Sequence, residues 1–298
     1  MNVLSLFDGM SCGQIALNRV GIKYDNYYAA EIEKASIEVT MDNYPNTIQL
    51  GDVLQVHARD LPRIDLLFGG SPCQGFSYGG KGLNFEDPRS KLFFEFVRLL
   101  NECKPKYFLL ENVLMKKEHE IIISKYLGVE PVQINSALVS AQNRERLYWT
   151  NINMQQYGLF GESIANIPMP KDKKITLRDV IDNSKAYHRR KILNPLSIRH
   201  TGNYAQFDNS GKGYASTDQR FFYLNGKSGT LSKSSSSIPK FESGCDDYCF
   251  VADRTICEKL QTVPVDYTKV VAKSKAFEML GNGWTVDVIA HIFSFMKF

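Results

Sequence analysis

The chain has 298 residues, of which 43% are hydrophobic and 23% are charged, and its formal net charge is +4. This composition is typical of a globular protein with a sizeable core, and no apolar run reaches the roughly eighteen residues of a membrane-spanning helix. The opening residues MNVLSLFDGM lack a basic stretch before an apolar one. They predict a first strand rather than a signal peptide.

The first half of the chain alternates between strand patterns and helix patterns. Strands are predicted over 2–7, 27–32, 64–70 and 106–113, helices over 13–21, 34–44, 90–102 and 118–127, and later strands over 131–139 and 146–152. This alternation favours an open α/β fold whose mostly parallel sheet carries helices on both faces.

Beyond about residue 160 the composition changes. The sequence up to about 250 is rich in Ser, Gly, Asn, Lys and Tyr and predicts a smaller, loop-rich module. Helical periodicity returns over 255–263, and a turn at GNGW precedes a final amphipathic helix. We therefore expect a cofactor-binding domain over 1–160, a second domain over 161–254, and a segment over 255–298 that returns to the first domain.

Six cysteines in a chain without an export signal are expected to be reduced. Cys245, Cys249 and Cys257 lie close in sequence, and zinc is one reading of that spacing. No nearby histidine or second close pair completes four ligands, so we expect free thiols and no metal.

The segment LSLFDGMSCGQIAL is typical of a strand, a glycine-bearing turn and a helix. In an open α/β sheet, such a turn lets a ligand approach the backbone beyond the strand. Glu31 follows the second strand, where an acidic residue can hold ribose hydroxyls, and Asp52 can accept from an adenine amino group. Taken singly, each is equally a cap or turn residue. Together they favour an adenosine-containing ligand without a pyrophosphate, foremost S-adenosylmethionine.

A cysteine behind a proline in GGSPCQGFS follows a buried-looking strand. Cys73 and Glu111 are both expected at the carboxyl ends of strands, on the edge where α/β enzymes work. Arg144 and Arg146 lie two residues apart at the start of a strand, where alternation directs both to one face.

These residue types suit one reaction. A thiolate that adds to carbon 6 of cytosine makes carbon 5 nucleophilic towards a sulfonium methyl group. A protonated glutamate at ring nitrogen N3 and an arginine at the O2 oxygen offset the charge that develops, and the arginine also favours the thiolate. The loop is therefore expected to present an exposed cysteine as a covalent nucleophile.

The chain resembles the DNA cytosine-5 methyltransferases, which carry FDGMSCG, Glu31, GDV, GGSPCQGFS, ENV, QNRERLY and GNGW in this order. The resemblance covers 1–152 and 255–298. The length is similar to that of prokaryotic or phage members, and FDGMSCG and the C-terminal stretch are similar to the animal de novo enzymes. The resemblance implies a Rossmann-like S-adenosylmethionine-dependent core, a target-recognition domain and S-adenosylhomocysteine as product.

By this resemblance Cys73 is the nucleophile, Glu111 engages N3 of a flipped-out base, Arg146 contacts O2, and Arg144 supports the base and the glutamate. The implied cofactor contacts are Phe7, Asp8, Gly9, Met10, Ser11, Cys12, Glu31, Ile32, Asp52, Val53, Pro72, Asn282, Gly283 and Trp284. One stretch departs from the family. Where members often carry an arginine and then Thr-Pro-x-Glu, this chain reads VADRTICEKLQTVP.

The expected partner is double-stranded DNA, bound by a monomer at a cytoplasmic, nucleoid-associated location, with a restriction endonuclease as a candidate partner. Basic runs such as KAYHRRK at 185–191 are read equally as phosphate contacts or as a solvated face. Three alternatives remain: a tRNA cytosine-5 methyltransferase of the same fold, a catalytically inactive DNA-binding paralogue, and a small-molecule methyltransferase. The intact cysteine, glutamate and cofactor loop argue against the paralogue.

Overall fold

A computed structural model describes residues 1–71, 88–157, 162–192, 199–200, 202–206, 220–232, 238–245 and 247–297. Pro72 and Cys73 lie outside the described residues. The chain forms two compact units. The first unit consists of Met1–Ile134, Glu145–Met169 and Val288–Phe298, and the second of Asn135–Arg144 and Pro170–Asp287.

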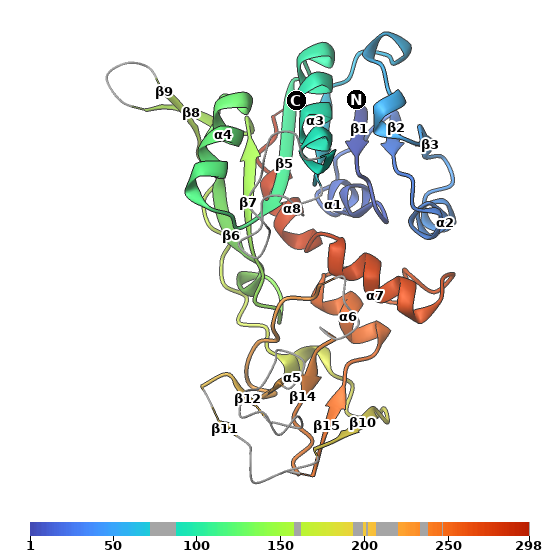
Figure 1. Ribbon diagram of the computed structural model, residues 1–298, viewed down its shortest axis with the longest axis vertical. Coiled ribbons are helices and arrows are strands. Elements are labelled where there is room, and N and C mark those ends of the chain that lie inside the picture. Colours follow the sequence, from blue (N-terminus) through green and yellow to red (C-terminus); the bar gives the residue numbers. More distant parts are fainter. Residues whose placement is uncertain are drawn as a thin grey trace. The chain divides into compact units, whose positions relative to one another are not determined.

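The first unit is built on a sheet of seven strands in the order β3-β2-β1-β4-β5-β7-β6 (Figure 1). The strands are β1 (Asn2–Leu6), β2 (Asn26–Ala30), β3 (Ile48–Gln49), β4 (Leu66–Gly69), β5 (Tyr107–Val113), β6 (Val132–Asn135) and β7 (Glu145–Thr150). The five strands from β3 to β5 pair in parallel, whereas β5 pairs with β7 in the antiparallel sense. The expected mostly parallel α/β fold is confirmed.

Helices cover both faces of this sheet. They are α1 (Cys12–Arg19), α2 (Lys34–Asn43), α3 (Pro88–Cys103), α4 (Lys117–Leu127) and α8 (Val286–Phe293), and two 3₁₀ turns, Val53–Gln55 and Ala58–Asp60, follow β3. Side chains alternate along the strands, so Leu67 and Phe68 of β4 face opposite layers. Phe68 meets Phe293 of α8 at a ring distance of 5.5 Å, on the face that α1 also covers.

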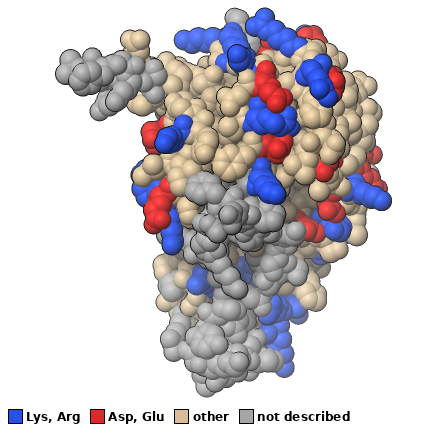
Figure 2. Space-filling model, turned by 45° about the horizontal axis from the view of Figure 1, so that its top comes forward, with Lys and Arg blue, Asp and Glu red and all other residues tan. Residues whose placement is uncertain are grey.

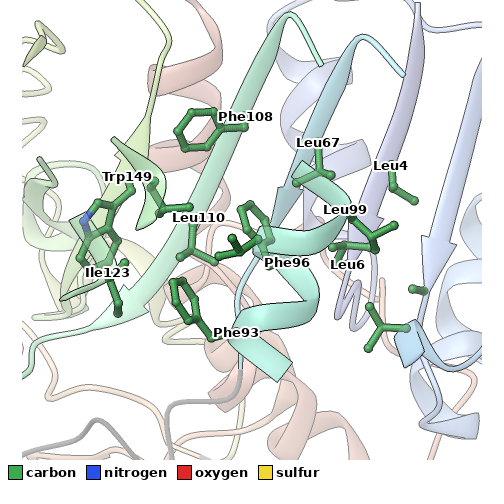
Figure 3. Packing of buried hydrophobic residues seen from close by; sticks show 14 of the residues in the cluster. Leu4, Leu6, Leu67, Phe93, Phe96, Leu99, Phe108, Leu110, Ile123 and Trp149 are labelled. Carbon is green, nitrogen blue, oxygen red and sulfur yellow. The ribbon is translucent and has the colours of Figure 1, made fainter. Parts of the chain in front are cut away.

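The other face of the sheet packs against α3. Figure 3 shows Phe93, Phe96 and Leu99 of this helix lying against strand side chains such as Leu67 and Leu110. All five are at most 1% exposed. Burying each such side chain contributes about 1.5–3 kcal/mol to the free energy of folding. This layer therefore holds in place the strands whose carboxyl ends carry the predicted site residues.

The second unit contains a sheet of six short strands in the order β10-β15-β14-β13-β12-β11. The strands are β10 (His188–Lys191), β11 (Arg199–His200), β12 (Tyr204–Gln206), β13 (Arg220–Phe222), β14 (Lys240–Phe241) and β15 (Tyr248–Val251). Its small core contains Ile192, Ala205, Phe221 and Cys249. The helices of the second unit are α5 (Leu177–Val180), α6 (Arg254–Leu260) and α7 (Lys273–Asn282). The antiparallel pair of β8 (Met154–Tyr157) and β9 (Glu162–Ala165) belongs to the first unit.

The unit boundaries differ from the domains expected over 1–160, 161–254 and 255–298. Residues 255–287 belong to the second unit, and so does the stretch Asn135–Arg144. None of the described helices is long and apolar enough to cross a membrane.

Two element predictions need correction. The predicted turn over 281–284 is partly helical, because α7 runs to Asn282 and buries Ala276, Met279 and Leu280 at helical spacing. The strand expected over 131–139 ends at Asn135, whose side chain accepts from the Ala137 N–H and starts a 3₁₀ turn.

Gly13 allows helix α1 to pack closely against the sheet. A Cβ added at Gly13 would lie 2.3 Å from the Phe68 ring and 3.0 Å from the Tyr27 hydroxyl. Both rings belong to the packed layer, so neither can move aside cheaply.

We expect Gly13→Ala to lower the free energy of unfolding by about 1–2 kcal/mol, since overpacking outweighs the better helix propensity of alanine. Urea unfolding measures this. The matched control is Gly202→Ala, where a Cβ meets nothing within 4 Å, and we expect a change within about 0.5 kcal/mol. Equal stability of the two variants would contradict the packing argument.

Candidate functional site

The candidate site lies along the carboxyl edge of the parallel strands. The chain runs outwards from β1 to β2 and β3 on one side, and β4 and β5 lie on the other side of β1. Ligands of open α/β sheets bind where the strand order reverses in this way. Here that point is between β1 and β4, and the loop after β1 lies beside it.

The loop after β1, residues 7–11, has an unusual backbone. Phe7, Gly9 and Ser11 have φ values of 56°, 59° and 59°, so three of five residues are left-handed. For Phe7 and Ser11 this conformation costs about 1–2 kcal/mol each. Such strain persists only where the surroundings fix it, which is common at ligand sites.

The carboxylate of Asp8 is the centre of the contacts that fix this loop. Oδ1 accepts from Ser5 Oγ at 2.6 Å and from the Tyr27 hydroxyl at 2.7 Å, and Oδ2 accepts from Ser11 Oγ at 2.5 Å. Burial raises the pKa of Asp8 to about 6, even though these three donors act in the opposite direction.

Glu31, just after β2, holds the loop from its other side. Its Oε2 accepts from the Gly9 N–H at 2.7 Å, while Oε1 accepts from the N–H groups of Ile32 and Glu33, both at 2.8 Å. The neighbouring Ile32 is 72% exposed, which is unusual for a large apolar residue. An acidic group and a free apolar side chain therefore stand side by side.

Asp52 follows β3 and starts the 3₁₀ turn Val53–Gln55, with its Oδ1 accepting from the Leu54 N–H at 3.0 Å. Val53 is buried. Met10 and Cys12 are buried as well, so these residues offer a ligand only their backbone. The prediction that Phe7–Cys12, Glu31, Ile32, Asp52 and Val53 bind the cofactor remains a prediction.

These residues fit an adenosine ligand that has no phosphates. A pyrophosphate needs free N–H groups at the turn before the helix. Here the Gly9 N–H is already bonded to the Glu31 carboxylate, which would also repel a phosphate. S-adenosylmethionine, the ligand expected from the sequence, is an adenosine compound that carries no phosphate.

Glu111 and Arg146 meet across β5 and β7. Arg146 Nε lies 3.0 Å from Glu111 Oε1, and the two side chains are only 13% and 11% exposed. The pairing register places Glu111 opposite Tyr148 and Val113 opposite Arg146. The two charged residues are therefore diagonal neighbours on one face of the sheet, which is within reach for long side chains.

The next residue along β5 ties the edge to β4. Asn112 Nδ2 donates to the carbonyl and hydroxyl oxygens of Ser71, at 3.4 and 3.3 Å, and both residues are buried. Ser71 is the last described residue before Pro72 and Cys73. The start of the cysteine loop is therefore held next to Glu111.

Arg144 has different partners from Arg146. It precedes β7, so strand alternation does not extend to it, and its guanidinium is buried in the second unit. It donates to the carbonyl oxygens of Leu231 at 2.8 Å, Gly281 at 3.2 Å and Gly283 at 2.9 Å. Strand alternation therefore does not fix the direction of Arg144 relative to Arg146, and the role of Arg144 beside the base stays a prediction.

The turn predicted to close the cofactor site, Asn282–Trp284, is held by Arg144 together with two buried glutamines of the second unit. Gln261 Nε2 donates to the Leu280 and Gly283 carbonyls, and Gln142 Nε2 donates to Gln261 Oε1 at 3.2 Å. Gln142 Oε1 also accepts from the Leu231 N–H. Two residues of QNRER thus fix the Leu231 peptide and this turn within the second unit.

The stretch that departs from the family pattern still braces its surroundings. Glu258 is fully buried and accepts from the N–H groups of Asp266 and Thr268 and from the Thr268 hydroxyl. Arg254 donates to the Thr268 and Val271 carbonyls. The arginine and the glutamate thus hold the loop that follows α6.

The cysteines of the second unit do not form a cluster. Cys249 and Cys257 are buried and Cys245 is exposed, and none of these three forms a disulfide. Within the described ranges, no group of three His, Cys, Asp or Glu side chains could hold a metal ion.

Charge is mixed over the upper part of the surface in Figure 2, where Lys and Arg side chains interleave with Asp and Glu. In the second unit, two arginines stack on tyrosine rings. Arg189 on the exposed edge strand β10 lies over the Tyr248 ring at 4.6 Å, and Arg220 on β13 lies over Tyr204 at 4.9 Å. A stacked guanidinium is held in place while its N–H edge can still bind an anion.

The sequence did not reveal several residues whose side chains support loop 7–11 and the start of the cysteine loop. Tyr27 and Gln14 lie beneath loop 7–11, and Asn112 fixes the start of the cysteine loop. Tyr27 had a detectable signal, since a polar tip on the inward side of a buried strand needs a partner. Gln14 in the apolar stripe of a predicted helix carried the same signal.

The fold is an open α/β sheet with acidic and polar side chains along the carboxyl edge of its parallel strands, and comparison gives the family. The family model of C-5 cytosine-specific DNA methylases matches residues 1–297. The chain therefore belongs to this family of DNA cytosine methyltransferases.

Curated relatives agree with that assignment, and a solved structure shares the fold. The type II methyltransferase M1.ScrFI of Lactococcus lactis subsp. cremoris is 28% identical over 300 residues, covering 96% of this chain and 75% of that protein. The orphan methyltransferase M.SPRI of Bacillus phage SPR is 35% identical over 161 residues, or 50% of this chain and 37% of that one. The fold is similar to that of the S. pombe Dnmt2 methyltransferase, with a TM-score of 0.68, 16% identity and coverage of 99% and 97%.

The raised pKa of Asp8 predicts a pH dependence of stability. Between its ordinary value of 3.8 and about 6, the folded state binds more protons than the unfolded state. The stabilising contribution of protonated Asp8 is therefore complete below about pH 4 and is lost as the pH rises to about 6. Asp8→Asn cannot ionise. We expect the free energy of unfolding of this variant, relative to wild type, to rise by about 1–3 kcal/mol from pH 4 to pH 7 in urea titrations. A constant difference would contradict the raised pKa.

Proposed function

We propose that this protein transfers the methyl group of S-adenosylmethionine to carbon 5 of a cytosine flipped out of double-stranded DNA, through a covalent bond between Cys73 and carbon 6. The observation that carries the proposal is the Glu111–Arg146 pair at the carboxyl end of β5, beside the Asn112–Ser71 contact that leads into the cysteine loop. Family membership supplies the substrate class.

The cofactor would be held by loop 7–11, Glu31 and Asp52. Glu31 would receive the ribose hydroxyls, the exposed Ile32 would contact the adenine, and Asp52 would accept from its amino group. When bound, S-adenosylmethionine supplies an electrophilic methyl group. Asn282, Gly283 and Trp284 complete the proposed contacts by resemblance to the family, and Pro72 is proposed on the same ground.

The protein side of the reaction follows from the charge that moves. As the Cys73 thiolate bonds to carbon 6, electron density shifts onto the ring, and Glu111 gives a proton to N3. Arg146, which pairs with Glu111, would donate to O2 and stabilise the same charge. Carbon 5 would gain the methyl group as its bond to the sulfonium breaks and S-adenosylhomocysteine is released. A solvent water molecule would then take the carbon 5 proton, the double bond would re-form as the Cys73 thiolate is expelled, and the N3 proton would return to Glu111.

DNA contacts are proposed for the sheet of the second unit. The stacked Arg189 and the exposed Lys191 of β10 would bind phosphates and position the duplex. We propose a monomer on DNA, because the base flips into a pocket of one chain. M1.ScrFI is named a type II enzyme, which supports a partner endonuclease, whereas M.SPRI is named an orphan.

Replacing the nucleophile tests the covalent step. We expect Cys73→Ser to reduce methylation below detection while leaving duplex DNA binding within about twofold, because only the thiolate adds to carbon 6. Methyl incorporation from labelled cofactor and gel-shift titrations measure the two properties. As a control, Cys245→Ser removes an exposed thiol of the second unit and should leave both unchanged. Turnover by Cys73→Ser would refute the proposed role.

Replacing the glutamate tests assistance at N3. We expect Glu111→Gln to slow covalent trapping on 5-fluorocytosine DNA by about 10²–10³-fold, since an amide cannot deliver the proton. The matched control is Glu145→Gln, an exposed neighbour of Arg146. A near-normal trapping rate for Glu111→Gln would argue against the assignment. Trapping on RNA but not on DNA would change the substrate class instead.

A further inference from the structure

Beneath loop 7–11 lies a buried hydroxyl to which neither the sequence patterns nor the family resemblance assigns a role. We propose that Tyr27 is a positioning residue for cofactor binding, whose hydroxyl acts through Asp8 to hold loop 7–11 in its binding conformation. The inference rests on the proposed function, because loop 7–11 is where the cofactor would bind.

The loop needs support from outside itself. Phe7 and Ser11 both have left-handed backbone conformations that L-residues avoid, so an unsupported loop would relax to other conformations. The Asp8 carboxylate ties together the loop, β1 through Ser5, and β2 through Tyr27. Without the Tyr27 hydroxyl, the link from this carboxylate to β2 is gone.

The Tyr27 ring is placed by packing and not by its hydroxyl. Tyr27 is 2% exposed, with its ring 6.0 Å from that of Phe68 and 5.6 Å from that of Tyr24. Gly13 of α1 leaves just enough room beside the hydroxyl. Removing the oxygen alone therefore keeps the packing and tests only the hydrogen bond.

A second set of polar side chains supports the same loop from α1. Gln14 Nε2 donates to Ser11 Oγ at 3.0 Å and to Thr47 Oγ1 at 2.8 Å, and Gln14 Oε1 accepts from the Tyr24 hydroxyl at 2.7 Å. Ser11 is thus held by Asp8 on one side and by Gln14 on the other. The loop geometry is held by a connected buried network, in which Tyr27 is the side chain that ties the Asp8 carboxylate to β2, beside the backbone bond from the Asp8 N–H to the Ala30 carbonyl at 3.2 Å.

Tyr27 stays a donor under all relevant conditions. Burial raises its pKa well above the ordinary value, and the nearby Asp8 acts in the same direction. Its hydroxyl is therefore protonated and faces Asp8 Oδ1. Tyr27 is 2% exposed and acts through Asp8, so its effect should appear in cofactor affinity and not in the chemical step.

The test uses the full chain with S-adenosylmethionine as the probe. Isothermal titration gives its Kd, and steady-state methylation of DNA gives KM and kcat. We expect Tyr27→Phe to weaken binding and raise KM by about 5- to 20-fold, with kcat at saturating cofactor within about twofold of wild type. The matched control is Tyr28→Phe, the next residue of β2 on its other face, with all three values unchanged.

A second variant covers the case in which Tyr27→Phe fails to fold. Ser5→Ala removes another donor to Asp8 Oδ1 from β1, and we expect the same weaker binding with unchanged kcat. Wild-type affinity in a folded Tyr27→Phe, or a fall in kcat at constant KM, overturns the inference alone. A wild type that does not bind S-adenosylmethionine overturns the proposed function and the inference together.

Discussion

The close approach of α1 to β4 is the constraint on which the candidate site depends. Only a glycine at position 13 lets the helix rest against the Phe68 ring. With the helix that close, the chain must leave β1 through a tight turn, and Phe7 and Ser11 take up strained conformations. The Asp8 carboxylate then lies at the point where β1, β2 and the helix converge. Packing thus determines the shape of the loop, and hydrogen bonds preserve it.

Much of the first unit could be predicted from the sequence because its central strands, β1, β4 and β5, are buried on both faces. Continuous apolar runs such as Leu66–Gly69 are recognisable without any knowledge of their neighbours. Several strands of the second unit have only two or three residues, as in Arg199–His200 and Lys240–Phe241, and such strands exist only through their pairing partners. Helix α7 was missed because its last two residues, Gly281 and Asn282, were read as a turn, although α7 buries Ala276 and Leu280 at helical spacing.

The residue types of the site could be predicted, but their pairings could not. Glu111 faces Arg146 because of the register between β5 and β7, which no local pattern specifies. Arg144 contacts Leu231 and Gly281, which lie far away in sequence, so its partners depend on tertiary structure alone. Its two-residue spacing from Arg146 suggested a shared role, yet the strand begins only after Arg144.

The bond between the Glu31 carboxylate and the Gly9 N–H has a consequence for competition inside a cell. Adenine nucleotides such as ATP and NAD are abundant metabolites that share the adenosine group. In many α/β proteins the turn after the first strand attracts their phosphates through free backbone amides. In this chain a resident carboxylate already occupies the Gly9 amide and repels further negative charge. A phosphate placed at this turn would therefore meet a carboxylate instead of a free amide, so the turn disfavours phosphorylated adenosine compounds.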